Sequence, residues 1–309
     1  MTDQSAIQTL VSHVGRRWPD HQKFMEKSFD NRADDVVQVS EKLAQCILTL
    51  ANDEEGGIDA LCDDYRFLCE DIVLPEEIYF RRNGKYRLSS FDEAEAECYA
   101  NAPFMARYMN GLLLSDVLWV NHASAFANFV TDYLPRLPEN ARHLEIGPGH
   151  GLFLYFASMH QNVASVAGWD ISPTSIAKTA HALELLGARL EPKLELQNMF
   201  DAAPASDAEL YDSITMSEIL EHLEDPVAAV QAAGRFLRKG GTLFVNVPAN
   251  SPAPDHIFLF EGLDHANEIV TRGGFAVEDS TAFPMGGVTL AQAVKHRLSV
   301  SCVVVGRKL

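Results

Sequence analysis

The stretch HLEIGPGHGLFLYFA, from His143 to Ala157, is the most informative part of the chain. An apolar strand pattern ends at Glu145, a glycine-rich turn follows, and a helical pattern begins after Gly151. Glycine has no Cβ, so backbone at these positions can approach a ligand closely. The ligand can then contact the free N–H groups at the start of the helix. The pattern predicts a ligand-binding turn between a strand and a helix.

A dinucleotide is the first ligand to consider, because a similar glycine turn binds pyrophosphate in dinucleotide-binding folds. Phe153 and Leu154, however, stand where the third glycine of that fingerprint would fall. The carboxylate of Glu145, just before the glycines, would also repel pyrophosphate. The turn therefore favours a ligand that carries an amine.

A second acid, Asp170, ends the next strand pattern in VAGWDISPTSI. A carboxylate about 20 residues after the glycine turn can accept both hydroxyl groups of a ribose. Asp170 could instead only cap the following helix, in whose first turn Pro173 fits. The occurrence of turn and acid together, in this order, favours the ribose interpretation.

The periodicity of the chain changes near residues 135–138. Residues 1–137 have mainly helical spacing, and we expect helices at 36–51, 57–73 and 106–134, the last with a break near Gly111 or Asn121. Asn83-Gly84 lies between two short strand-like runs and predicts a β-hairpin. The acid-rich run from Asp53 to Glu77 predicts a solvated helix face.

Residues 138–309 alternate between apolar strands and amphipathic helices. The expected strands are 142–147, 164–170, 193–197, 211–216, 241–247, 275–282 and 298–305, and the expected helices are 151–160, 173–187, 226–238 and 260–272. This alternation predicts an α/β, Rossmann-like fold with a mostly parallel sheet covered on both faces. A short helical stretch separates the last two strands, which we expect to pair antiparallel at the sheet edge. We divide the chain into domains at 1–137 and 138–309.

Composition excludes several classes of partner. The chain has 43 acids and 25 bases, a net charge of −18, and no basic cluster, which argues against nucleic acid and anionic membrane surfaces as partners. Its five cysteines include no CxxC pair, which is typical of a reducing compartment. We find no signal peptide pattern and no apolar run of about 18 residues, so we expect a cytoplasmic protein.

Five segments resemble, in order, the motifs of class I S-adenosylmethionine (SAM)-dependent methyltransferases. They are LEIGPGHG together with Asp170, LQNMFD (196–201), YDSITMSEILEHLEDP (211–226), FLRKGGTLFVNVP (236–248) and RGGFAV (272–277). The resemblance covers about residues 138–309. It implies a seven-stranded sheet whose last strand is antiparallel, and a helical N-terminal lid domain over the substrate.

Carried over by position, the resemblance also implies the cofactor-binding residues. The methionine part of SAM would be surrounded by Glu145, Gly147, Gly149 and Gly151. Asp170 would hold the ribose, and the adenine would pack on Ile171 and be lined by Asn198, Met199 or Asp201. The sulfonium would lie beside Ser217 and Glu218.

The spacing Glu218-x-x-Glu221-His222, with a later Asp255-His256, is a further candidate site. Glu218, Glu221, His222 and His256 could hold a divalent metal with open positions, and a similar ExxEH plus later His is a metal site in a plant small-RNA 2′-O-methyltransferase. Metal-free relatives carry the same segment, and we expect no metal here. His222 and Glu218 are then the candidate catalytic residues, with His222 as general base because its ordinary pKa lets it accept a proton near neutral pH.

The expected function is methyl transfer from SAM to a small-molecule metabolite, in secondary metabolism. One alternative is a cyclase of methyltransferase fold, in which the amine of SAM attacks its own γ-carbon to give azetidine-2-carboxylate and methylthioadenosine. Another is a non-catalytic subunit that binds SAM. A homodimer is compatible with the sequence, and the acceptor is not identified by it.

Overall fold

The computed structural model describes residues 5–204 and 206–309. The chain separates into two compact units, each built from segments that are distant in sequence. The helical unit comprises residues 1–127, 250–259 and 283–300, and the sheet unit comprises residues 128–249, 260–282 and 301–309. Among the described residues, no helix combines the length and the apolar character that a membrane crossing requires.

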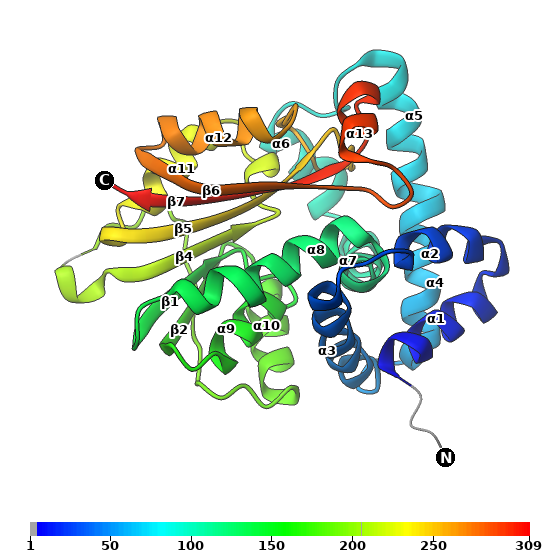
Figure 1. The fold of residues 1–309 in the computed structure, drawn as a ribbon, viewed down its shortest axis with the longest axis horizontal. Helices are drawn as coiled ribbons and strands as arrows, with labels where there is room; N and C mark the ends of the chain where they lie inside the picture. The colour runs from blue at the N-terminus through cyan, green and yellow to red at the C-terminus, as the bar shows by residue number, and fades with distance from the viewer. Residues whose placement is uncertain (1–4, 205) are drawn as a thin grey trace. The chain divides into compact units, whose positions relative to one another are not determined.

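The sheet unit contains one seven-stranded sheet with the order β3-β2-β1-β4-β5-β7-β6. Figure 1 labels these strands except β3. The strands are β1 Ala141–Ile146, β2 Val163–Asp170, β3 Lys193–Leu196, β4 Tyr211–Ser217, β5 Leu237–Ala249, β6 Phe275–Pro284 and β7 Val300–Lys308. β1 pairs in parallel with both β2 and β4, so the strand order reverses direction there. Ligands of open α/β sheets bind at the carboxyl ends of strands at such a point. β7 runs antiparallel to the other strands, and the predicted fold class is confirmed.

Among the described residues, the α-helices that lie wholly within the sheet unit are α9 Leu152–Met159, α10 Pro173–Leu185, α11 Pro226–Gly234 and α12 Leu263–Arg272. α9 and α10 pack against β1, β2 and β3, whereas α11 contacts β5 and α12. Ser172 and Asp225 cap α10 and α11, each followed directly by a proline that suits the first helical turn. These local signals explain why both helices begin where the sequence predicts.

The helical unit holds most of the remaining helices. They are α1 Ala6–Arg17, α2 Gln22–Phe29, α3 Asp34–Ala51, α4 Gly57–Phe67, α5 Leu74–Asn83, α6 Phe91–Ala94, α7 Ala102–Leu118, α8 Val120–Asn128 and α13 Leu290–His296, with α8 ending one residue inside the sheet unit. Two π-helical segments, Leu68–Val73 and Glu95–Tyr99, continue α4 and α6.

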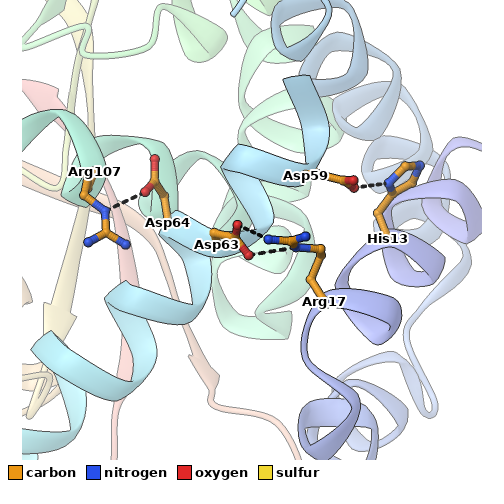
Figure 2. A network of polar contacts seen from close by, with 6 residues as sticks. All are labelled: His13, Arg17, Asp59, Asp63, Asp64 and Arg107. Carbon is orange, nitrogen blue, oxygen red and sulfur yellow. Dashed lines mark hydrogen bonds and ion pairs between the residues drawn. The ribbon is translucent and has the colours of Figure 1, made fainter. Parts of the chain in front are cut away.

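α4 is held on both sides by ion pairs (Figure 2). On one side, Asp59 contacts His13 and Asp63 contacts Arg17, and these two partners lie on α1. On the other side, the Asp64 carboxylate accepts a 2.7 Å hydrogen bond from Arg107 on α7. The acid-rich run was predicted to be a solvated face. Asp59 is exposed, as predicted for this run, and all three acids also bind neighbouring helices, which a one-dimensional charge pattern cannot reveal.

One local prediction for the helical part is wrong and another is confirmed. Asn83-Gly84 does not form a hairpin: it ends α5, with Gly84 in the left-handed conformation (φ +71°) and its N–H bonded to Phe80 O. An Asn-Gly pair suits a helix terminus as well as a tight turn, because both need a positive φ. The break in the long helix falls at Trp119, which is extended, so the predicted break near Asn121 is confirmed. Gly111 lies inside α7, where a Cβ would stand 2.7 Å from Leu68 Cβ on the segment that continues α4.

Candidate functional site

The glycine turn after β1 has the backbone that its sequence predicts. Gly147, Gly149 and Gly151 all have positive φ, of +69°, +51° and +76°. A Cβ on Gly147 would lie 2.1 Å from Ile219 Cδ1. The turn therefore requires glycine for conformation and for space, and it lies against the segment that follows β4.

Glu145 lies in β1 just before this turn and is only 2% exposed. Among the described residues its Oε2 atom has no hydrogen-bond partner. Burial raises the pKa of Glu145 well above its usual range, opposed by a backbone hydrogen bond from Leu154. A buried carboxyl group of this kind becomes favourable as a carboxylate when a cation lies beside it. The position fits the amine that the sequence predicts for the ligand.

Asp170, at the end of β2, already holds the start of α10. Its Oδ1 accepts a 2.8 Å hydrogen bond from Ser172 N, and its Oδ2 accepts one of 2.6 Å from Ser175 Oγ. Ser172, and not Asp170, is therefore the N-cap of α10, and Asp170 supports the start of the helix from outside it. Carboxylate oxygens each accept more than one hydrogen bond, so these contacts also leave room for ribose hydroxyls.

Apolar side chains are exposed next to Asp170. Ile171 is 58% exposed and Leu196, which pairs with Asp170 across β2 and β3, is 61% exposed. Phe200 follows in the next loop and is exposed as well. These side chains offer an apolar surface for a flat heterocycle at the carboxyl edge of the sheet.

The loop 197–200 is fixed by polar contacts. Asn198 Oδ1 accepts a 2.9 Å hydrogen bond from Phe200 N, and Arg235 Nη2 donates to Met199 O at 2.9 Å. The Met199 side chain is buried. The roles of Asn198 and Met199 toward adenine stay predictions.

Ser217 and Glu218 follow one another at the end of β4. Asn246, in the paired position on β5, donates from Nδ2 to Ser217 Oγ and to Glu218 Oε1, at 3.0 Å each. Sequence reasoning missed Asn246. The sequence does contain a signal for it, because Asn246 is the one amide in the otherwise apolar strand run FVNV. The run of β4 likewise ends at two polar residues, Ser217 and Glu218.

Glu221 and His222 lie in a 3-10 turn, Leu220–His222. Glu221 is fully buried, and its Oε1 is 3.6 Å from His222 Nε2. Glu218 has a left-handed backbone (φ +55°) and precedes this turn, so the three residues do not lie on one helical turn. His256 belongs to the helical unit, where its Nδ1 contacts Ser251 O at 2.7 Å. The four-residue metal site stays a hypothesis.

Comparison with known proteins agrees with this geometry. A family model described as a methyltransferase domain matches residues 119–280, more than half of the chain. The ubiquinone biosynthesis O-methyltransferase of Xanthomonas axonopodis pv. citri is 34% identical over 142 residues, 46% of this chain and 57% of that protein. The protein of the same name from Vibrio cholerae serotype O1 (El Tor Inaba N16961) is 30% identical over 134 residues, 43% of this chain and 51% of that protein.

A solved structure, the N-methyltransferase NodS from Bradyrhizobium japonicum, aligns over 60% of this chain and 94% of its own with 17% identity and a TM-score of 0.46. The match to the two curated relatives spans little more than half of their length. The family match is decisive: the chain belongs to the methyltransferase-domain family, as its ordered motifs predict. SAM is the cofactor of this family.

Proposed function

We propose that the chain is a SAM-dependent methyltransferase acting on a small-molecule acceptor. The observation that carries the proposal is the buried, unpaired Oε2 of Glu145 beside a left-handed glycine turn, at the point where the strand order reverses. The acidic net charge of −18 supports a small acceptor over a nucleic acid.

Three positions bind the cofactor in this proposal. Glu145 accepts hydrogen bonds from the amine, Asp170 accepts from the ribose hydroxyls, and Ile171 covers the adenine. Gly147, Gly149 and Gly151 allow the backbone to approach the methionine part. When bound, SAM supplies a methyl group on a positively charged sulfur, already activated for in-line displacement.

The protein then has to align the acceptor and exclude water. His222 takes the proton from the acceptor group as general base. The Glu221 carboxyl group, 3.6 Å from His222 Nε2, stabilises the imidazolium that forms. Residues 1–137 act as the lid and substrate domain, which would shield the reacting atoms from water.

The finer parts of the proposal concern the acceptor and its setting. The relatives are named for O-methylation in ubiquinone biosynthesis, which supports a hydroxyl group as the acceptor. We place the reaction in secondary metabolism and in the cytoplasm, with a homodimer as the assembly. Size-exclusion chromatography with light scattering tests the assembly directly.

Mass spectrometry of the fragment that leaves SAM tests the reaction. Methyl transfer yields S-adenosylhomocysteine (SAH) and depends on the acceptor, for which a panel of phenols, amines and carboxylic acids is suitable. Methylthioadenosine formed from SAM alone would replace this proposal with the cyclase. SAM that binds but is never consumed with any acceptor would identify a non-catalytic subunit.

A metal-dependent variant of the mechanism is supported by the side chains of Glu221 and His222. Glu221 and His222 present a carboxylate and an imidazole close together, a donor pair that divalent metals accept. The primary proposal needs no metal, and we expect a chelator to leave turnover unchanged. Loss of turnover that Mg²⁺, Mn²⁺ or Zn²⁺ restores would establish the metal variant.

A further inference from the structure

Asn246, on β5, contacts both residues at the end of β4, Ser217 and Glu218. It is 4% exposed, and its register partner across the sheet is Ser217. The Nδ2 group donates to Ser217 Oγ and Glu218 Oε1 at 3.0 Å, which uses both of its hydrogens. Because a carboxylate only accepts, the contact with Glu218 also fixes which side of the amide carries the nitrogen.

The backbone of Glu218 is held by the same residue. Glu218 N donates to Asn246 O at 2.8 Å, and Glu218 adopts a φ of +55°. A non-glycine residue in this region is strained, so it persists only where the surroundings hold it. The main chain of β5 thus contacts the backbone of Glu218, and the Asn246 side chain contacts its carboxylate.

This fixed carboxylate belongs to the segment that lies against the glycine turn. The residue after Glu218 is Ile219, whose Cδ1 fills the space above Gly147. In the proposed function the methionine part of the cofactor occupies this turn. SAM and SAH differ there by one methyl group and one positive charge, and a carboxylate held in place favours the charged form.

Building on the proposed function, we propose that Asn246 is a positioning residue that holds the Glu218 carboxylate beside the cofactor sulfur and thereby makes the protein prefer SAM over SAH. The carboxylate attracts the sulfonium before transfer and loses that attraction once the sulfur is neutral. The product is released more readily as a result.

Titration calorimetry with SAM and with SAH measures this preference without any acceptor. The variants are Asn246→Leu, which keeps the approximate shape but has no donor, and Glu218→Gln, which keeps the size but removes the charge. Each is expected to lower the ratio of Kd for SAH to Kd for SAM about tenfold. The double variant should lower it no further, because both changes remove the same interaction.

Asn267→Ala is the matched control. Asn267 is another asparagine of the sheet unit, and its amide donates to Ser280 Oγ at 3.1 Å. Its substitution should leave the ratio of Kd for SAH to Kd for SAM unchanged. Asn246→Ser is the second variant if Asn246→Leu does not fold, and it should lower the ratio because its hydroxyl is too short to reach both partners.

The outcomes separate the inference from the function on which it depends. If the variants bind both ligands with a ratio within twofold of the unchanged protein, the inference is overturned and the proposed function stands. If the unchanged protein binds neither SAM nor SAH, the proposed function itself fails. Circular dichroism of each variant confirms that binding is measured on folded protein.

Discussion

Asp170 illustrates how one side chain can serve both the fold and the ligand. Its two oxygens hold the first turn of α10 through Ser172 N and Ser175 Oγ. The proposed ribose contacts would use the remaining acceptor capacity of the same oxygens. A substitution at Asp170 therefore removes local structure and binding together, and a control is needed to separate them.

Asp170→Ala is expected to weaken SAM binding at least tenfold, about 1.4 kcal/mol, if two ribose hydrogen bonds are lost. Calorimetry measures the affinity. Ser175→Ala removes only the 2.6 Å contact within the protein and should change affinity less than threefold. Equal losses in the two variants would leave Asp170 with a role in supporting the start of α10 alone.

His143 makes the stability of the sheet unit depend on pH. It is fully buried in β1, its Nδ1 contacts Ser213 Oγ at 2.9 Å, and burial lowers its pKa to about 3. Between pH 6.5 and 3 the unfolded chain binds the proton and the folded chain does not. The free energy of unfolding therefore falls as the pH falls below about 6.5, by up to about 1.4 kcal/mol per pH unit.

His143→Gln keeps a polar group near Ser213 and removes this titration. We expect the free energy of unfolding to fall less steeply with pH between pH 6.5 and 5, because nearly one fewer proton is bound on unfolding. Denaturant unfolding at several pH values measures this slope. Other buried histidines, such as His21, whose pKa burial lowers to about 4, supply the remaining slope. An unchanged slope would contradict this account of His143.

At the scale of elements, the connection from β1 to α9 depends on glycine at its first position, Gly147. Gly147 combines a φ of +69° with a neighbour, Ile219 Cδ1, 2.1 Å from where a Cβ would stand. Gly240 in β5 has a φ of +76° and no atom within 4 Å of its Cβ position. An alanine at Gly240 therefore introduces backbone strain alone, whereas an alanine at Gly147 introduces both strain and a steric clash.

Gly240→Ala should lower the free energy of unfolding by about 1–2 kcal/mol through strain alone. Gly147→Ala should cost more, because Ile219 or the turn must also shift, and it should weaken SAM binding more than tenfold. Thermal unfolding and calorimetry measure the two effects. If both variants bind SAM normally, the turn after β1 is not part of the cofactor site.

For the whole molecule, the important feature is that the helical unit is assembled from three segments. Residues 250–259 belong to it through Cys98 Sγ, which donates to Pro254 O, and through Tyr108 OH, which donates to Asp255 Oδ1 at 3.0 Å. Ile257 packs against the apolar cluster of Leu88, Ala94 and Cys98. Removing the N-terminal residues would therefore expose surfaces on later segments.

Deleting residues 1–100 is expected to abolish turnover and to reduce solubility, because Leu88, Ala94 and Cys98 leave with the deleted part. Activity and light scattering of the truncated chain test this. Ser89→Ala, which removes one exposed contact to Glu93 within that part, should remain active and soluble. A fully active fragment 130–309 would contradict the lid role proposed for residues 1–137.

The strands, their order along the chain and the glycine turn were predictable from sequence alone. Each depends on local properties: apolar runs, capping residues before proline, and glycines where φ must be positive. Glu145 and Asp170 could be named as site residues for the same reason, since each ends a strand pattern directly before a turn. The start of β5 at Leu237 was placed too late, because Phe236 and Leu237 are buried by distant parts of the chain.

Only the tertiary structure revealed which distant residues meet. Asn246 acquires its role from strand pairing with Ser217, and Asn83-Gly84 ends a helix rather than closing a hairpin. The three-segment helical unit likewise depends on contacts such as Tyr108 with Asp255, 147 residues apart. Local sequence specifies backbone conformation and periodicity, whereas pairing across such distances depends on how the whole chain packs.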